Sequence, residues 1–232
     1  MKRSEVNQII RNAQEFLASK QFLLPEWADW SLDDWKNRRA EVNYIVERML
    51  GWDITDFNSG NFHQRGLFLF TLRNGKYGCD KKPYAEKIMI VEENQETPLH
   101  FHWSKMEDII NRGGGNLVVE LHNATPDEQL DTTPVRYRID GIERVAQPGE
   151  RIIVRPGQSI CMEQYVYHRF YGEEGKGTVM VGEVSQCNDD TSDNRFYESV
   201  GRFPEIDEDE EPLRLLVADY AKFALTCQPS TL

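Results

Sequence analysis

The N-terminal part of the chain repeats apolar side chains with the period of an α-helix. Over Val6–Leu17 these side chains recur at the i, i+3, i+4 and i+7 spacing of an amphipathic helix. A second helix is predicted from Ser31, where two aspartates follow in the favourable first turn, and Gly51 is its expected stop. Pro25 separates the two helices. We therefore expect residues 1–60 to form a helical flank.

From about residue 67 the pattern changes to short segments rich in branched and aromatic residues, separated by Gly, Pro, Asn and Asp turns. Consecutive short strands without intervening helices predict an antiparallel sandwich or barrel, expected over residues 61–203. The predicted strands are Leu67–Leu72, Glu86–Glu92, Pro98–Trp103, Leu117–His122, Val135–Ile139, Arg151–Arg155, Ser159–Met162, Tyr167–Tyr171 and Thr178–Val184.

The C-terminal part returns to a helical pattern. Pro212 suits the first position of a helix, and apolar residues with helical spacing follow it. The acidic run Asp207–Glu211 is expected to be a solvated prelude to this helix, where the helix dipole favours it. We thus predict a C-terminal helix and tail over residues 204–232. Without an internal repeat or a long linker, residues 1–232 are expected to form one domain.

Charge and composition narrow the possible functions. The 232 residues include 27 Lys and Arg against 39 Asp and Glu, a net charge of −12. Nucleic acids and anionic membranes are bound by basic surfaces, so neither is an expected partner. No apolar run approaches the roughly 20 residues that span a bilayer, and the N-terminus lacks the apolar stretch of a secretory signal. Four cysteines without a Cys-x-x-Cys pair are typical of a reduced, cytoplasmic protein.

The histidines carry the clearest chemical signal. His100 and His102 alternate on one predicted strand, so both rings project from the same face. Two polar rings on one buried face are difficult to explain by packing and indicate a metal site. Glu107 can join them if residues 103–106 form a bend, and His168 on a later strand is the fourth candidate. Three imidazoles and one carboxylate suit Mn²⁺, Fe²⁺, Zn²⁺, Ni²⁺ or Co²⁺ and leave positions for substrate oxygens. The other two histidines are expected to be structural: His63 and His122.

The His-x-His-x₄-Glu pattern, a Gly-rich turn at Gly113–Gly115, a Pro-Gly turn and a single later His together resemble the two metal-binding motifs of the cupin superfamily. A narrower resemblance covers nearly the whole chain, which is similar to the D-lyxose ketol-isomerase family. The segments that carry it are Met1–Ser4, Pro83–Val91, His100–Trp103, Glu107–Asn116, Gly182–Ser185, Asn188–Asp190, Asp193–Phe196 and Gly201–Pro204.

This resemblance implies a mainly β protein, a cupin-type antiparallel jelly-roll barrel with helices at its two ends. It also implies a manganese-preferring aldose–ketose isomerase that interconverts D-lyxose with D-xylulose, and usually D-mannose with D-fructose. Such enzymes are commonly homodimers. The metal ligands of the family fall on the four residues that the spacing indicates: His100, His102, Glu107 and His168.

Aldose–ketose isomerisation by proton transfer requires a base and stabilisation of the enediolate oxygens, which a divalent ion supplies as a Lewis acid. Two carboxylates in segments that resemble the family are candidates. We expect Glu198 to be the base and Glu183 to contact the substrate or the metal ligands. Lys87 shares a strand face with apolar residues and is a candidate catalytic group, although a surface charge is an equally good interpretation.

Three further residues are candidates for binding the sugar. Lys105 lies in the predicted bend between His102 and Glu107, so it starts close to the metal. Asp189 and Asp190 could bind sugar hydroxyls, although both also suit ordinary turns. Two other functions use the same histidines: a cupin dioxygenase or other non-heme iron enzyme, and a cupin that binds sugar without turnover.

Overall fold

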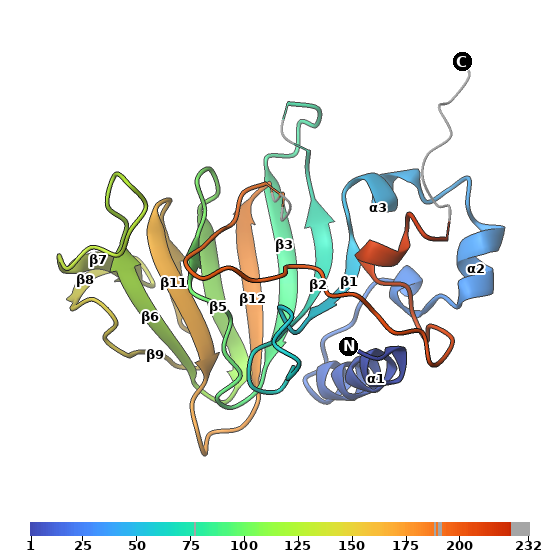
Figure 1. Ribbon diagram of the computed structural model, residues 1–232, viewed down its shortest axis with the longest axis horizontal. Helices are drawn as coiled ribbons and strands as arrows, with labels where there is room; N and C mark the ends of the chain where they lie inside the picture. Colours follow the sequence, from blue (N-terminus) through green and yellow to red (C-terminus); the bar gives the residue numbers. More distant parts are fainter. Residues whose placement is uncertain (77, 188, 190–191, 224–232) are drawn as a thin grey trace.

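Two antiparallel sheets form the centre of the computed structural model, which describes residues 1–76, 78–187, 189 and 192–223 (Figure 1). The larger sheet contains, in spatial order, β1 (Gly51–Thr55), β2 (Leu67–Asn74), β3 (Tyr84–Val91), β12 (Val179–Gln186), β5 (Glu107–Gly114), β10 (Ser159–Met162), β7 (Val135–Ile139) and β8 (Ile142–Ala146). The smaller sheet contains β13 (Arg195–Phe196), β4 (His100–Phe101), β11 (Val166–Gly172), β6 (Leu117–Asn123) and β9 (Ile152–Val154). This is the expected mainly β jelly-roll architecture. None of the helices in the described part has the length and apolar character needed to cross a membrane.

Alternating side chains give the large sheet two different faces. On β3, Met89 and Val91 pack into the interior between the sheets, whereas Ile88 and Ile90 pack against the helix α1 (Arg3–Ser19). Because successive side chains on a strand point to opposite faces, Lys87 shares the interior face with Met89. The same alternation places polar side chains at one end of an otherwise apolar barrel interior.

The N-terminal flank is helical as predicted, but it is shorter and more broken. The predicted second helix is two short pieces, α2 (Leu32–Asn37) and α3 (Asn43–Glu47), and the 3₁₀ turn η1 (Glu26–Asp29) precedes them. Gly51 does not stop a helix; it begins β1 with a φ of +123°. A Cβ atom there would lie 2.6 Å from the Tyr220 hydroxyl, so a glycine fits the position. The flank therefore supplies an edge strand to the large sheet.

The sequence pattern missed four strands: β1, β5, β8 and β13. β5 begins at Glu107 and carries polar residues on both faces, so its sequence is also compatible with a turn. It nevertheless pairs with β12 on one side and β10 on the other, and these neighbours supply the hydrogen bonds that hold it in a strand. β8 is an exposed edge strand that pairs with β7 only.

The predicted C-terminal α-helix is wrong for residues 213–223, where the structure has only the 3₁₀ turn η2 (Val217–Asp219). Residues 224–232, the predicted tail, lie outside the described part. Leu215, Leu216 and Val217 are consecutive and buried, which a one-sided helix in solvent does not allow. Their burial against α1, α2 and β1 fixes this segment in an irregular path.

The acidic run is exposed as predicted, but it precedes no α-helix in the described part of the chain and instead docks on the first turn of α1. The buried Arg3 guanidinium contacts Glu208 at 2.8 Å and Asp219 at 2.8 Å. Asp209 accepts a hydrogen bond from the Ser4 backbone N–H at 2.9 Å. The first N–H groups of a helix have no partner within it and carry partial positive charge. The carboxylates therefore satisfy this helix end and neutralise the buried arginine.

Candidate active site

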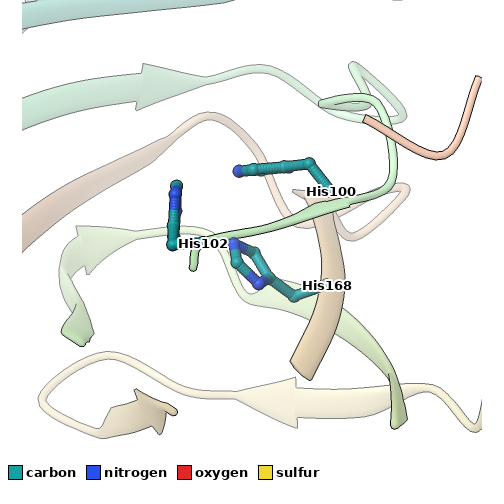
Figure 2. A group of neighbouring side chains, drawn as sticks. All are labelled: His100, His102 and His168. Carbon is teal, nitrogen blue, oxygen red and sulfur yellow. The ribbon is translucent and has the colours of Figure 1, made fainter. Parts of the chain in front are cut away.

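Three imidazoles converge at one end of the barrel, between the two sheets (Figure 2). His100 on β4 lies directly opposite His168 on β11 in the strand register, and His102 follows immediately after β4. One ring nitrogen of each histidine lies within 4.8 Å of those of the other two. The alternation of His100 and His102 and the pairing of β4 with β11 together produce this cluster.

Hydrogen bonds at Nδ1 hold the three rings in the same tautomer. Each Nδ1 contacts a backbone carbonyl oxygen: His100 contacts Pro98 at 2.8 Å, His102 contacts Asp193 at 2.7 Å and His168 contacts Val166 at 2.9 Å. A carbonyl only accepts, so each Nδ1 carries the proton and each neutral ring has its lone pair on Nε2. This is the usual arrangement of metal-binding histidines, whose second nitrogen is held by a hydrogen bond.

Glu107 approaches the histidines from the opposite sheet. The chain leaves β4, bends over residues 103–106 and enters β5 at Glu107, so the bend that the sequence analysis required is present. Oε1 of Glu107 lies 3.2 Å from His168 Nε2 and 3.5 Å from His102 Nε2. Its Oε2 contacts the Lys105 ammonium at 2.6 Å. One carboxylate oxygen therefore faces the imidazoles, and the lysine holds the other.

The four side chains fit a divalent metal ion. The Nε2 atoms of His102 and His168 are buried without a hydrogen-bond partner, a costly arrangement unless another group occupies the space between them. Burial and the two neighbouring rings lower the pKa of His100 well below its usual value, which leaves a neutral ligand. Burial opposes ionisation of Glu107, but the Lys105 ammonium outweighs it and holds the pKa of this carboxyl well below its usual range. Three neutral nitrogens and one carboxylate oxygen suit a divalent transition metal.

A second buried carboxylate lies beside this cluster. Glu183 on β12 contacts the ammonium of Lys105 at 3.0 Å and that of Lys87 at 3.4 Å. Glu107, Glu183, Lys87 and Lys105 are each at most 5 % exposed. Two lysines and two glutamates balance in charge, but buried ion pairs rarely stabilise a fold more than apolar packing would. Their burial in one place is therefore better explained by chemistry than by stability.

A cavity opens beside these groups, with about 470 Å³ of space that protein atoms do not fill, including its mouth. Its wall combines the charged groups and two of the histidines with apolar side chains of the barrel interior, such as Leu69 and Met89. Several residues of this wall were not predicted from the sequence to be part of the site, among them Phe57, Asn194, Phe196 and Arg202. Arg202 is held at the cavity by the buried carboxylate of Asp53, at 2.5 Å.

These four residues are difficult to find by sequence pattern, because loops and a two-residue strand far apart in the chain bring them to the site. For three of them one signal exists, since Asn194 and Phe196 stand in the Asp193–Phe196 segment, and Arg202 in the Gly201–Pro204 segment, that carry the family resemblance. Nothing in the local sequence around Phe57 indicates a role in the cavity.

Two of the predicted site residues, Glu198 and Asp189, are not brought to the cavity. Glu198 does not line it: its side chain is 63 % exposed and contacts Arg65 at 3.0 Å. The predicted role of Glu198 as the base is therefore inconsistent with this geometry. Asp189 lines a different, polar cavity and accepts a hydrogen bond from the Ser192 hydroxyl at 2.6 Å. Asp190 lies outside the described residues.

The two remaining histidines lie outside the cluster. His63 is exposed and its Nδ1 contacts Glu92 at 2.7 Å. His122, at the end of β6, lies close to Gly149, and burial lowers its pKa. Neither ring faces the three central imidazoles.

Comparison with known proteins places the chain among sugar isomerases. The sequence pattern of the family described as D-lyxose isomerase matches residues 1–220. The chain is 48 % identical over 226 residues to a D-lyxose/D-mannose isomerase of Serratia proteamaculans, covering 96 % of this chain and 99 % of the relative. It is 45 % identical over 226 residues to a D-lyxose/D-mannose isomerase of Escherichia coli O157:H7, covering 96 % and 100 %.

Solved structures with much lower identity share the fold. The L-ribose isomerase of Acinetobacter sp. DL28 in complex with L-ribose superimposes with a TM-score of 0.57 at 15 % identity, over 89 % of this chain and 98 % of that one. The L-ribose isomerase of Cellulomonas parahominis with L-ribose gives a TM-score of 0.55 at 17 % identity, with the same coverage. At this identity the likeness establishes the jelly-roll architecture alone. The sequence matches over nearly the full length establish that the chain belongs to the D-lyxose isomerase family.

Proposed function

We propose that the protein is a metal-dependent aldose–ketose isomerase that interconverts D-lyxose with D-xylulose, and D-mannose with D-fructose. One observation carries the proposal: Lys105 joins a cluster of three imidazoles and a carboxylate to a second buried carboxylate, Glu183, in the same cavity. The curated relatives, named D-lyxose/D-mannose isomerases, support the choice of sugars. The two aldoses share their configuration at C2 to C4 and differ by one hydroxymethyl group.

The reaction defines what the cavity has to provide. A proton leaves C2 of the open-chain aldose and a proton is delivered to C1, while the C2 hydroxyl loses its proton and the aldehyde oxygen gains one. His100, His102, His168 and Glu107 would hold the ion, for which we propose Mn²⁺. When bound, this ion supplies Lewis-acid stabilisation of the negative charge that develops on the two substrate oxygens. The protein must add a base that reaches both carbons.

Glu183 is our candidate for that base. Of the two carboxylates among the described residues of the cavity wall, Glu107 faces the imidazoles, which leaves Glu183 to act on carbon. Its carboxylate can accept the proton from C2 and return it to C1 on the same face of the sugar. Lys87 and Lys105 contact its Oε1 and so fix its position.

Lys105 also has a place in substrate binding. Its ammonium lies between Glu107 and Glu183, at the junction of the proposed metal site and the proposed base. An ammonium there can donate a hydrogen bond to a sugar oxygen near the reacting carbons. This supports the predicted substrate-binding role of Lys105. For Asp189 and Asp190 no comparable support exists.

An aldose panel tests the function. Purified protein loaded with Mn²⁺ should convert D-lyxose to D-xylulose and D-mannose to D-fructose, under air and under argon alike. A metal-replete preparation that is inert toward every pentose and hexose aldose would contradict the proposal. Turnover that requires O₂ would instead support an oxygen-dependent iron enzyme.

The route of the hydrogen can be followed in D₂O. A base that exchanges its proton with solvent leaves deuterium at C1 of the ketose, which mass spectrometry or NMR detects. Deuterium in D-xylulose would support proton transfer by Glu183. Turnover without any incorporation would favour a direct hydride shift between the two carbons.

We further propose a homodimer in the cytoplasm, on the strength of the family resemblance. Light scattering of the purified protein tests the assembly: a mass near 54 kDa, twice the 27.0 kDa of one chain, supports a dimer. A mass near 27 kDa at micromolar protein would contradict it.

A further inference from the structure

A short segment far along the chain lies directly against the ligand strand β4. This segment, residues 193–197, is called the roof segment here. Its two strand residues pair with β4: Arg195 with Phe101, and Phe196 with His100. The Tyr197 N–H donates to the Leu99 carbonyl at 2.9 Å. The roof segment therefore extends the small sheet over the histidine cluster.

The orientation of His102 depends on the roof segment. His100 and His168 bind the carbonyl two residues earlier in their own chain segment, so their local backbone orients them. The Nδ1 of His102 instead binds the carbonyl oxygen of Asp193, 91 residues away in sequence, at 2.7 Å. Among the three rings of the cluster, His102 alone is oriented from a distant part of the chain.

The side chain of Asp193 holds the bend that follows His102. Its Oδ1 accepts the Ser104 N–H at 2.9 Å, and its Oδ2 accepts the Lys105 N–H at 3.0 Å. This bend carries the chain from β4 across to Glu107, and Lys105 contacts Glu107 and Glu183. Through its carbonyl and its carboxylate, Asp193 thus contacts both a proposed ligand and the turn that positions the next one.

We propose that Asp193 is a positioning residue for the metal: it ties the roof segment to the ligand bend, so that retention of the ion depends on this docking. The inference rests on the metal site of the proposed function. Hydrogen-bond partners of ligating histidines fix the ring and raise its basicity, and their loss typically costs about 10- to 100-fold in metal affinity. By linkage, a bound ion stabilises the docked roof segment to the same extent.

The roof segment also forms part of the cavity wall. Asn194 and Phe196 line the cavity, and the Phe196 ring lies 5.4 Å from the His100 ring, centroid to centroid. A second anchor holds the segment: the Arg195 guanidinium contacts Glu128 at 2.8 Å, and Glu128 also accepts from the Trp103 indole at 2.8 Å. Asp193 and Arg195 therefore attach the same segment at two points.

Metal titration tests the inference. The dissociation constant for Mn²⁺ is measured on the full-length apoprotein from the EPR signal of the free ion, for wild type, Asp193→Ala and Asp193→Asn. We expect Asp193→Ala to weaken Mn²⁺ binding about 10-fold or more. Asp193→Asn keeps one acceptor oxygen but turns an amide donor toward a backbone N–H, so we expect a loss of several-fold.

Asp140 provides the matched control. Its carboxylate also accepts a backbone N–H in a turn, that of Ser159 at 2.8 Å, but it lies in the β7–β8 hairpin away from the cluster. Asp140→Ala should bind Mn²⁺ within 2-fold of wild type, which separates metal positioning from the loss of any turn-capping aspartate. Circular dichroism verifies that each variant is folded.

The outcomes are decisive. A folded Asp193→Ala protein with wild-type Mn²⁺ affinity overturns the inference; if that variant does not fold, wild-type affinity in Asp193→Asn does so. Equal weakening in Asp140→Ala also overturns it. These results are independent of the isomerase assay: a wild-type protein that binds Mn²⁺ but is inert toward aldoses contradicts the proposed function and leaves the role of Asp193 intact.

Discussion

At the scale of single residues, burial separates the two candidate bases. Glu183 is 4 % exposed and lies in the cavity wall, whereas Glu198 is exposed and contacts Arg65. We expect Glu183→Gln to retain the metal but to lower kcat for D-lyxose by about 10²- to 10⁴-fold, the usual contribution of a general base. Initial rates of D-xylulose formation, with elemental analysis of the same preparation, measure both effects.

Glu198→Gln is the comparison for that experiment. Its side chain is exposed and does not line the cavity, so we expect kcat within about 3-fold of wild type, in line with the small effects of surface substitutions. The reverse result, an active Glu183→Gln and an inactive Glu198→Gln, would return the role of the base to Glu198. It would also imply that the segment around residue 198 moves onto the cavity in the complex with sugar.

Among the histidines, we expect His102→Ala to lose the metal. The substitution removes one of the three ligand nitrogens and leaves Glu107 facing a gap. The purified variant should therefore retain less than one metal ion per chain. Elemental analysis after exhaustive dialysis measures the metal content. His122→Ala is the control, because that ring lies outside the cluster and its loss should leave the content unchanged. Loss of metal in both variants would indicate a general effect on folding.

Residues of one strand could be placed from sequence, but residues brought together by loops could not. The alternation of His100 and His102 follows from strand geometry, so one face of one strand was enough to indicate a site. Glu107 needed one further condition, a bend after the strand. Arg202 and Phe57 lie in irregular segments that reach the cavity. No periodic pattern in the sequence predicts the path of an irregular segment.

At the scale of elements, the acidic segment and α1 form one unit with a pH-dependent stability. The Arg3 side chain is fully buried and contacts Glu208, and this hydrogen bond lowers the pKa of Glu208 to about 2. A carboxyl whose pKa is depressed in the folded state contributes stability above its unfolded pKa, near 4.5, and loses it as the pH falls toward 2.

Glu208→Gln isolates this contribution. At pH 7 we expect the free energy of unfolding of the variant to be about 1 kcal/mol below that of wild type. The effect is small because the carboxylate is partly solvated. As the pH falls from about 4.5 to 2, the difference between wild type and variant should shrink toward zero. Urea denaturation at several pH values measures it. A difference that stays constant down to pH 2 would show that Glu208 acts through its shape and not its charge.

Elements with a clear period were predicted well, and elements held by their neighbours were not. The apolar stripe of α1 and the alternation of β3 are properties of their own residues. β5 is a strand because it lies between β12 and β10. The residues after Pro212 have a helical pattern, yet burial against α1, α2 and β1 from several sides overrides it.

At the scale of the whole molecule, the net charge of the chain differs from the charge balance inside the cavity. The chain carries a net charge of −12, yet the cavity wall pairs two lysines with two glutamates, so the interior is nearly neutral before an ion enters. A divalent cation would bring positive charge to a site whose protein groups already balance. The acidity therefore does not by itself create the metal site; the geometry of four side chains does.

The proposed ion would join the two sheets, so its removal should affect the whole barrel. His100 and His168 lie on the small sheet and Glu107 on the large one, and a shared ion links them across the interior. An ion that binds only the folded chain adds about 2.7 kcal/mol at a free concentration 100 times its dissociation constant. For a chain of this size, that corresponds to a rise in Tm of roughly 5 to 10 °C.

We therefore expect EDTA to abolish isomerisation and to lower Tm by that amount, and Mn²⁺ added in excess of the chelator to restore both. Differential scanning calorimetry and the D-lyxose assay on the same samples measure the two effects. In His102→Ala, which lacks a ligand, EDTA should leave Tm unchanged. If EDTA removes activity but leaves Tm unchanged in wild type, the prediction that a tightly bound ion stabilises the folded barrel is wrong.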